Sequence, residues 1–260
     1  MKLGIGTYGL MWSIGFEGAR PDSPLTPRHL ADEARRLGVR VVQSGPNLPF
    51  TREDVAYART LGVEVELGVA GLDIGDHIHF AGAAGASFVR TVLQEEAIDV
   101  PPVSLIETKL RALLPLLENW GVCLGLENSV VPAVTLRSVL ESIGSPHLGV
   151  TLDTVNSLVI GEGWRHVLAV LAPYTRCLHL KDFTVRREWH SMGFRITGTP
   201  AGRGDLDVPF LLDWLRSVGF SGSVILELWV PEQRTLDETI ALERSWAEQS
   251  VTYLRTLIQE

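Results

Sequence analysis

The sequence has few of the residues and none of the runs that mark secreted or membrane-spanning proteins. It contains two cysteines in 260 residues, Cys123 and Cys177, and both lie inside apolar strand-like runs. We therefore expect two buried thiols in a reducing, cytoplasmic compartment rather than a disulfide. No run approaches the ~18 uninterrupted apolar residues that a membrane span requires. The N-terminal segment lacks the long apolar core and cleavage site of a signal peptide, so we expect no secretion and no membrane partner.

Positive charge is also scarce in this chain. Lys and Arg together number 23, against 31 Asp and Glu, which gives a formal net charge of −8. Binding to nucleic-acid phosphates requires a basic surface, so the charge balance argues against a nucleic-acid partner. Hydrophobic residues make up 45% of the sequence, which is enough for one large core in a chain of this length.

Short apolar runs alternate with helix-like segments along the whole chain. Most of the runs are continuous rather than alternating, as is typical of parallel strands covered on both faces. This order predicts a single-domain (β/α)8 TIM barrel over residues 1–260. The alternative is an open doubly wound sheet, but the first apolar run contains no GxGxxG dinucleotide signature. The expected strands are Leu3–Gly9, Arg40–Ser44, Glu64–Gly71, Phe88–Leu93, Cys123–Glu127, Leu148–Asp153, Thr175–Asp182 and Ser223–Trp229.

Helix boundaries can be read at several points between these runs. Thr26 followed by proline predicts a helix start with Thr26 as the N-cap. Ser104 and Glu107 have the spacing of a capping box, and Pro115 should kink or shorten the helix that follows. Two further helices are expected at Val208–Val218 and Leu236–Ile258.

The segment Phe183–Asp207 is a long stretch without helical or strand periodicity. Loops of this length in compact domains usually serve as lids or binding loops, although a solvated surface excursion is the alternative. Its glycine-rich part, GTPAGRG, could bind an anion through backbone N–H groups or could simply shape a turn. The segment also contains Arg186, Arg187, Trp189, His190 and Arg195.

Four potential metal ligands each lie at or near the end of an expected strand in the second half of the chain. They are Glu127, Asp153, His179 and Glu227. Each alone has a structural explanation, such as a helix cap or an ion pair. A parallel barrel, however, brings its strand ends to one mouth, and buried carboxylates there need compensating positive charge. Three carboxylates and one imidazole suit a single divalent ion such as Mn²⁺, Mg²⁺ or Co²⁺.

The motifs around these residues are LGLENS, LDTVNS, HLKDF, GTPAGRGDLD and LELW. With them the sequence resembles the sugar phosphate isomerase/epimerase superfamily, the xylose isomerase-like TIM barrels. The resemblance implies that Glu127, Asp153, His179 and Glu227 bind the metal and that the substrate is a small carbohydrate. It also implies that Glu127 and Glu227 are the catalytic base and acid, which move a proton next to a carbonyl while the metal stabilises a cis-enediolate. Relatives are often homo-oligomers, so a homo-oligomer is possible here.

The sequence departs from the ketose 3-epimerase pattern at two positions. A histidine that contacts substrate stands three residues after the aspartate ligand in those enzymes, and here that residue is Asn156. The arginine expected before the PGxG-like turn is missing, although Arg195 lies nearby. Endonuclease IV, another relative, needs additional ligands for three metals, and the chain does not supply them in a suitable pattern. Its other histidines are scattered, as at His77, His79, His166 and His190.

A narrower resemblance involves LGIGTYGLMWSIG, VVQSGPNLPF and MGFRITGTPAGRGDLD, which are similar to the 3-oxoisoapionate decarboxylases. The decarboxylation of a β-keto acid also passes through an enolate, so the same four ligands would serve it. A carboxylate substrate would need cations, for which Lys181, Arg90 and Arg195 are the candidates. Other side chains expected to contact substrate are Gln43, Asn47, Trp12 and Asn156.

The combined expectation is a divalent-metal-dependent isomerase or epimerase of a small keto-sugar or sugar acid. The alternative is a metal-dependent decarboxylase of a sugar-derived β-keto acid, which better explains Asn156. Aldol cleavage and dehydration would use the same intermediate. A barrel that binds sugar without turnover is the non-catalytic alternative.

Overall fold

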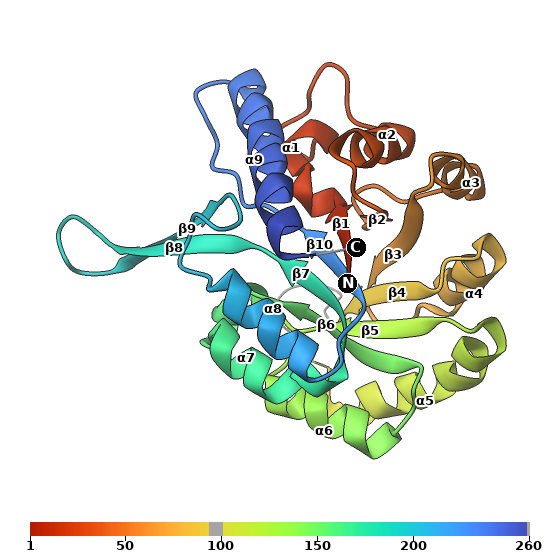
Figure 1. Ribbon diagram of the computed structural model, residues 1–260. Coiled ribbons are helices and arrows are strands. Elements are labelled where there is room, and N and C mark those ends of the chain that lie inside the picture. The colour runs from red at the N-terminus through yellow and green to blue at the C-terminus, as the bar shows by residue number, and fades with distance from the viewer. Residues whose placement is uncertain (94–100, 259–260) are drawn as a thin grey trace.

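The computed structural model describes residues 1–93 and 101–258 and has the expected barrel (Figure 1). Eight parallel strands close in the order β1-β10-β7-β6-β5-β4-β3-β2, which confirms the single-domain TIM barrel. Every neighbouring pair among these strands is parallel, as a (β/α)8 architecture requires. The strands are β1 (Lys2–Gly6), β2 (Val41–Gln43), β3 (Glu64–Ala70), β4 (Phe88–Val92), β5 (Cys123–Glu127), β6 (Leu148–Asp153), β7 (Thr175–Leu180) and β10 (Ser223–Leu226).

Helices surround the barrel and cover its outer face (Figure 1). The start predicted at Thr26 is confirmed, because its side chain accepts a hydrogen bond from the backbone N–H of His29. No helix within the described residues is long and apolar enough to cross a membrane. The helices are α1 (Met11–Ile14), α2 (Pro27–Leu37), α3 (Arg52–Thr60), α4 (Gly75–Ala84), α5 (Val103–Trp120), α6 (Ala133–Ile143), α7 (Trp164–Leu171), α8 (Val208–Ser217) and α9 (Leu236–Leu257).

Helix α5 differs from the sequence-based expectation at its N-terminus and at its internal proline. Its N-cap is Pro102, which makes no side-chain cap, so the capping box predicted from Ser104 and Glu107 is wrong. Pro115 does not shorten the helix, which runs on to Trp120. Pro115 lies on the exposed side, and tertiary packing of the opposite face outweighs the loss of one backbone hydrogen bond. That buried face consists of Ile106, Leu110 and Leu117.

Strands β1 and β10 each end three residues earlier than expected, at Gly6 instead of Gly9 and at Leu226 instead of Trp229. After β1 the chain turns into a 3-10 helix, η1 (Thr7–Gly9), and β10 ends at Leu226. Glu227 therefore lies just beyond its strand, in the segment that enters the mouth of the barrel. The two segments remain side by side there, because the backbone N–H of Leu228 donates to the carbonyl of Tyr8.

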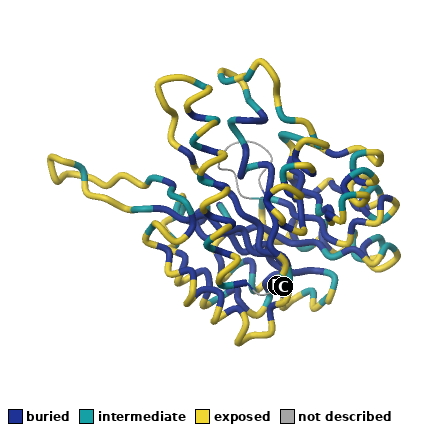
Figure 2. The backbone as a smooth tube through the Cα atoms, turned by 45° about the horizontal axis from the view of Figure 1, so that its top comes forward, coloured by how far each residue is buried: buried dark blue, intermediate teal, exposed yellow. Residues whose placement is uncertain are grey.

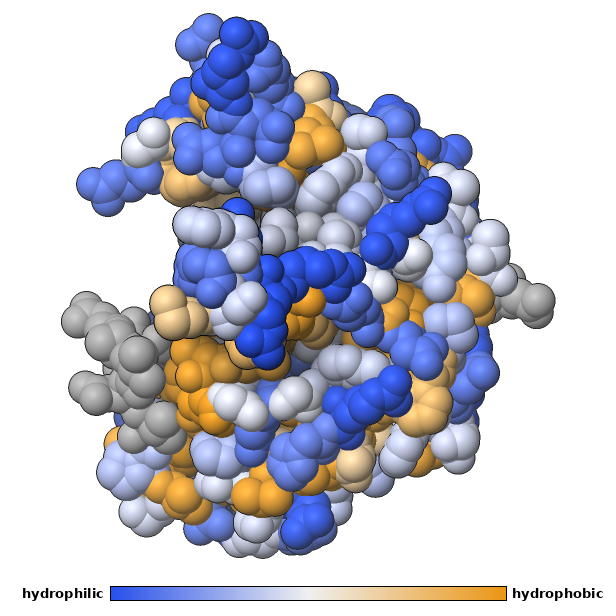
Figure 3. All heavy atoms as spheres, turned by 90° about the vertical axis from the view of Figure 1, so that its left-hand side faces the viewer, coloured by the Kyte–Doolittle hydropathy of each residue, from blue (hydrophilic) through white to orange (hydrophobic). Residues whose placement is uncertain are grey.

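The segment expected to be irregular contains an antiparallel hairpin. Strands β8 (Asp182–Arg187) and β9 (Phe194–Thr199) pair from Asp182↔Thr199 to Arg187↔Phe194. The hairpin projects away from the barrel, and most of its tip is exposed (Figures 1 and 2). Figure 3 views the molecule from the side on which the hairpin projects. Hydrophobic residues gather in the lower part of this view, below the hydrophilic ones. The prediction of irregular structure was wrong because the turn, with Ser191 at φ 64° and Gly193 at φ 129°, interrupts the strand pattern.

Two apolar layers lie on either side of the barrel wall. The larger one fills the space between strands and helices. Figure 2 shows that the residues at the centre of the molecule are buried. The smaller one contains Val41, Phe88, Cys177 and Ile225, which meet across the barrel interior from β2, β4, β7 and β10. Both cysteines are free thiols; Cys177 is buried as expected, whereas Cys123 is only half-buried.

Candidate metal centre

Four side chains converge at the mouth of the barrel, where β5, β6, β7 and β10 lie next to one another. Glu127 is the last residue of β5, Asp153 is the last residue of β6, and His179 lies near the end of β7. Glu227 follows β10 directly. None of the four is more than 3% exposed. The parallel barrel therefore places four residues from separate parts of the sequence in one buried cluster.

The donor atoms of this cluster face one another. His179 Nδ1 lies 3.6 Å from Glu127 Oε2, 3.8 Å from Asp153 Oδ2 and 3.4 Å from Glu227 Oε1. One ligand atom each of Glu127, Asp153 and His179 all lie within 4.8 Å of one another. His179 Nδ1 is buried without a hydrogen-bond partner. Buried polar atoms are rarely left unsatisfied, and this set of donors fits a divalent ion.

Two buried cations form part of the same cluster. Lys181 Nζ lies 2.5 Å from Asp153 Oδ2 and 2.8 Å from Glu227 Oε2. Arg90 Nε lies 3.0 Å from Glu127 Oε2. Burial alone would raise the carboxyl pKa values of Glu127 and Glu227, but the nearby positive groups outweigh it and hold both pKa values below their usual range. Both glutamates are thus ionised and already paired.

Asn156 lies between the acid and basic groups of the cluster. Its Nδ2 donates to Glu127 Oε1 at 2.6 Å, and its Oδ1 accepts from Lys181 Nζ at 3.2 Å. An amide can orient both partners by hydrogen bonds but cannot carry a proton between them.

Gln43 occupies a different position from the substrate contact that the sequence suggested. Its Oε1 lies 2.6 Å from His179 Nε2, and its Nε2 donates to Glu66 Oε2 at 2.9 Å. Gln43 therefore lies behind His179, inside the barrel, and does not line the cavity described next. Sequence analysis missed Glu66; the only signal was a glutamate inside the strand-like run EVELGVA.

A cavity of about 390 Å³ opens at the mouth beside the four ligands. Among the predicted substrate contacts, Arg90, Asn156 and Lys181 line it, together with Glu127 and Glu227. The sequence did not identify the other lining residues, which come from η1, α1, β4 and the segment after β10. They are Tyr8, Met11, Val92, Leu228 and Trp229.

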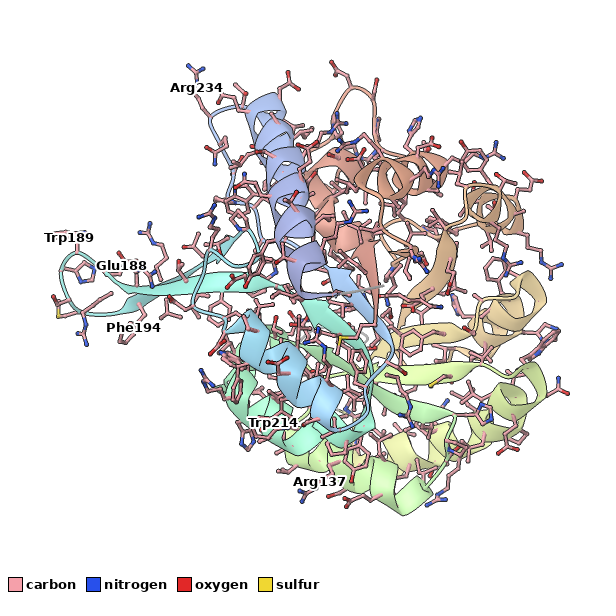
Figure 4. The ribbon with its side chains drawn as sticks, in the orientation of Figure 1. Arg137, Glu188, Trp189, Phe194, Trp214 and Arg234 are labelled. Atoms are coloured by element: carbon pink, nitrogen blue, oxygen red, sulfur yellow. The ribbon has the colours of Figure 1, made fainter. Side chains whose placement is uncertain are left out.

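Three other predicted contacts lie outside the cavity lining. Trp12 donates from Nε1 to the carbonyl of Val230, and its ring lies 5.1 Å from that of Phe16. Asn47 accepts a hydrogen bond from Thr7 Oγ1 at 2.8 Å. Arg195 is on the hairpin, where it pairs with Glu188 at 3.1 Å; Figure 4 shows Glu188 at the far end of the hairpin.

The backbone N–H groups of the glycine-rich segment GTPAGRG bind a side-chain carboxylate of the protein, that of Asp182. The buried Asp182 carboxylate accepts hydrogen bonds from the backbone N–H groups of Phe183, Gly202, Gly204 and Leu206. A Cβ on Gly204 would lie only 2.1 Å from Asp182 Oδ1. The segment therefore wraps around a carboxylate, and these N–H groups serve the fold.

The scattered histidines do not assemble a second site in the described residues. His77 and His79 lie on α4, His166 on α7 and His190 on the hairpin. The nitrogen of Trp120 donates to His79 Nδ1 at 3.0 Å. Over residues 1–93 and 101–258, the one group of side chains spaced to hold a metal ion is the one containing Glu127, Asp153 and His179.

Comparison with known proteins agrees with this architecture. Residues 13–257 match the model of the xylose isomerase-like TIM barrel family. The chain belongs to this family. The 3-oxo-isoapionate decarboxylase of Pectobacterium atrosepticum is 30% identical to the chain over 270 residues, covering 98% of this chain and 96% of the relative.

Solved structures share the fold at lower sequence identity. D-Psicose 3-epimerase from Clostridium cellulolyticum H10 superposes with a TM-score of 0.74 at 14% identity and covers 100% of both chains. A xylose isomerase-like barrel from Mycobacterium smegmatis, solved in complex with magnesium, gives a TM-score of 0.67 at 16% identity and covers 97% of both chains. Proteins that share this fold thus include a sugar epimerase and a barrel with bound magnesium.

Proposed function

We propose that the protein is a divalent-metal-dependent decarboxylase of a small, sugar-derived β-keto acid. The observation that carries the proposal is the pair of buried cations, Arg90 and Lys181, at the wall of the cavity. The 30% identity to 3-oxo-isoapionate decarboxylase over almost the full length supports it. Asn156, which stands where an epimerase would have a histidine, agrees with it.

The charges around the cavity favour an anionic substrate. Three carboxylates face two cations, through the ion pairs of Arg90 with Glu127 and of Lys181 with Asp153 and Glu227. The cluster therefore carries one excess negative charge, and a divalent ion would change this to one excess positive charge. A neutral keto-sugar would leave that charge unbalanced in a buried site, whereas one substrate carboxylate would neutralise it.

In the proposed reaction the C–C bond to the substrate carboxylate breaks and CO₂ leaves. The electron pair of that bond moves toward the keto oxygen, and the carbon that lost CO₂ then takes up a proton. Glu127, Asp153, His179 and Glu227 would hold the divalent ion, which supplies Lewis-acid stabilisation of negative charge on a substrate oxygen. Lys181 Nζ and Arg90 orient the anionic substrate, and Asn156 keeps Glu127 and Lys181 in place.

Isomerisation or epimerisation is the second candidate, and the fold similarity to D-psicose 3-epimerase favours it. In that reaction Glu127 and Glu227 would exchange a proton with carbon on opposite faces of the substrate. Both carboxylates line the cavity, but each is already paired with a buried cation. The two-glutamate assignment predicts that Glu127→Gln abolishes turnover; full turnover by that variant would exclude it.

Proton NMR in D₂O of the Mg²⁺-loaded protein, with β-keto sugar acids and keto-sugars, separates the candidates. The decarboxylase proposal predicts loss of the carboxyl carbon with deuterium in its place, and it predicts that a chelator stops the reaction. Deuterium uptake beside a carbonyl with the carbon skeleton intact would instead establish an isomerase or epimerase. Tight binding without turnover of either class would indicate a non-catalytic barrel.

A pair of arginine variants tests the charge argument directly. Arg90→Gln removes a buried cation at the cavity and should lower decarboxylation at least 100-fold, because it leaves Glu127 unpaired and the substrate anion unbalanced. Arg165→Gln is the matched control, because Arg165 is an exposed arginine that pairs with Asp207 at 3.8 Å. Equal activity in the two variants would contradict the proposed role of Arg90.

A further inference from the structure

The contacts behind His179 show how the metal site is held, whichever reaction it serves. We propose that Gln43 and Glu66 are positioning residues that fix the ring orientation and tautomer of His179, so that its Nδ1 lone pair remains free to bind a metal ion. The proposal rests on the metal centre and does not depend on decarboxylation.

The two ring nitrogens of His179 face different surroundings. Nδ1 faces the carboxylates of Glu127, Asp153 and Glu227, whereas Nε2 lies 2.6 Å from Gln43 Oε1. A neutral imidazole carries one proton, and an amide oxygen can only accept it. Gln43 therefore keeps the proton on Nε2, and Nδ1 retains the lone pair that a metal needs.

Gln43 could present either end of its amide to His179, and Glu66 selects which one. Gln43 Nε2 donates to Glu66 Oε2 at 2.9 Å. If the amide were reversed, its oxygen would face the Glu66 carboxyl group and its nitrogen would face His179. The histidine proton would then move to Nδ1 and block the metal position. Glu66 thus acts on His179 through Gln43.

This chain of contacts crosses the interior of the barrel. Glu66 lies on β3, Gln43 on β2 and His179 on β7, and β1 and β10 stand between β2 and β7 in the strand order. Strand β1 has glycines at this level. A Cβ on Gly4 or Gly6 would lie 2.7 Å or 3.1 Å from the side chain of Ile225, so any larger residue would crowd the interior.

Metal affinity and the tautomer of His179 test the proposal without a substrate. Gln43→Leu should weaken Mn²⁺ binding about 10- to 100-fold by titration calorimetry, since loss of such partners costs this much in other metal sites. In the metal-free protein, at a pH high enough for the His179 ring to be neutral, ¹⁵N NMR should show a single Nε2–H tautomer for wild-type His179 and a mixture for Gln43→Leu. The His179 signals can be assigned by comparison with His179→Gln.

The two Glu66 variants separate positioning from packing. Glu66→Gln keeps an acceptor for Gln43 and should retain wild-type Mn²⁺ affinity and the single tautomer. Glu66→Leu removes the acceptor and should behave like Gln43→Leu. Thr151→Val is the control, because Thr151 is buried and its Oγ1 has no hydrogen-bond partner.

The proposal is overturned if folded Gln43→Leu binds Mn²⁺ as tightly as wild type and keeps the Nε2–H tautomer. It is equally overturned if the two Glu66 variants give the same affinity. Should Gln43→Leu not fold, the Glu66 pair decides. Because turnover of the wild-type protein is measured separately, failure here leaves the proposed reaction standing, and the converse also holds.

Discussion

Arg90 and Arg195 show how position changes the role of one residue type. Each has a glutamate partner, Glu127 for Arg90 and Glu188 for Arg195. Arg90 is 3% exposed, while the side chain of Arg195 is 70% exposed. A buried pair that loses one partner leaves an uncompensated charge, whereas an exposed pair contributes about 1 kcal/mol or less. Only the Arg90 pair therefore bears on the chemistry of the cavity.

Glu66 gives a prediction about stability and pH. Burial raises the pKa of its carboxyl group above 4.5, so the folded state binds this proton more tightly than the unfolded chain does. The stability that the fold gains by binding this proton on Glu66 is fully present below pH 4.5. It is lost as the pH rises through the raised pKa. Glu66→Gln removes this titration. We expect the variant to be more stable than wild type at pH 7, with the difference shrinking toward acid pH.

Urea unfolding of both proteins across this pH range provides the measurement. A wild-type protein that gains stability relative to Glu66→Gln as the pH rises would show that the Glu66 carboxylate is favourably ionised in the fold. The prediction is decided by whether the difference in the free energy of unfolding between the two proteins grows or shrinks as the pH rises, and not by the size of that difference.

At the scale of elements, Asp182 links the hairpin to the segment that follows it. It begins β8, and its carboxylate holds the backbone of residues 202–206 through N–H donors. The hairpin tip has no such support; Trp189 is 90% exposed, and Figure 4 shows Trp189 and Phe194 far from the barrel. In the long connection between β7 and α8, the segment around residues 202–206 is thus held by hydrogen bonds to Asp182, whereas the hairpin tip projects into solvent.

Asp182→Ala should destabilise the protein by about 3 kcal/mol or more, because it leaves several buried N–H donors unsatisfied. Chemical denaturation measures the loss, and hydrogen exchange at Gly202 and Gly204 should become faster. Asp205→Ala is the matched control. Asp205 is exposed, pairs with Arg186 and accepts from the exposed backbone N–H of Val185, which water can satisfy, so its loss should cost about 1 kcal/mol or less. Similar losses in both variants would argue against the anchoring role of Asp182.

At the scale of the whole molecule, barrel closure brings four distant segments to one point. The four candidate ligands come from β5, β6, β7 and the residue after β10, which are consecutive in the barrel. Metal binding would therefore tie together the C-terminal ends of half the barrel wall. A ligand that binds only the folded state raises its stability by mass action.

We expect a divalent ion at 100 times its dissociation constant to add about 2.7 kcal/mol to the free energy of unfolding. For a chain of this size, that corresponds to a rise in Tm of roughly 5–10 °C. Thermal unfolding with Mn²⁺ and then with excess chelator measures the effect, which should disappear in Asp153→Asn and persist in Asp205→Asn. A shift of equal size in Asp153→Asn would place the ion elsewhere.

The barrel could be predicted from the sequence alone, because eight apolar runs separated by helical segments have few other ways to bury both faces of each strand. The sequence also predicted that the side chains of Glu127, Asp153, His179 and Glu227 lie together, since parallel strands end at the same mouth. Such local signals failed at the Ser104 capping box and at the hairpin, where packing and turn geometry outweighed them.

The contacts behind and around these four side chains could be read only from the folded structure. The contact of Gln43 with His179 joins strands that are not neighbours, and the contact of Glu66 with Gln43 depends on the direction of each side chain inside the barrel. The same holds for the Asp182 carboxylate within the glycine-rich segment. Strand periodicity fixes which face a residue occupies, but the partner across a closed interior depends on strand order, register and the space left by glycines.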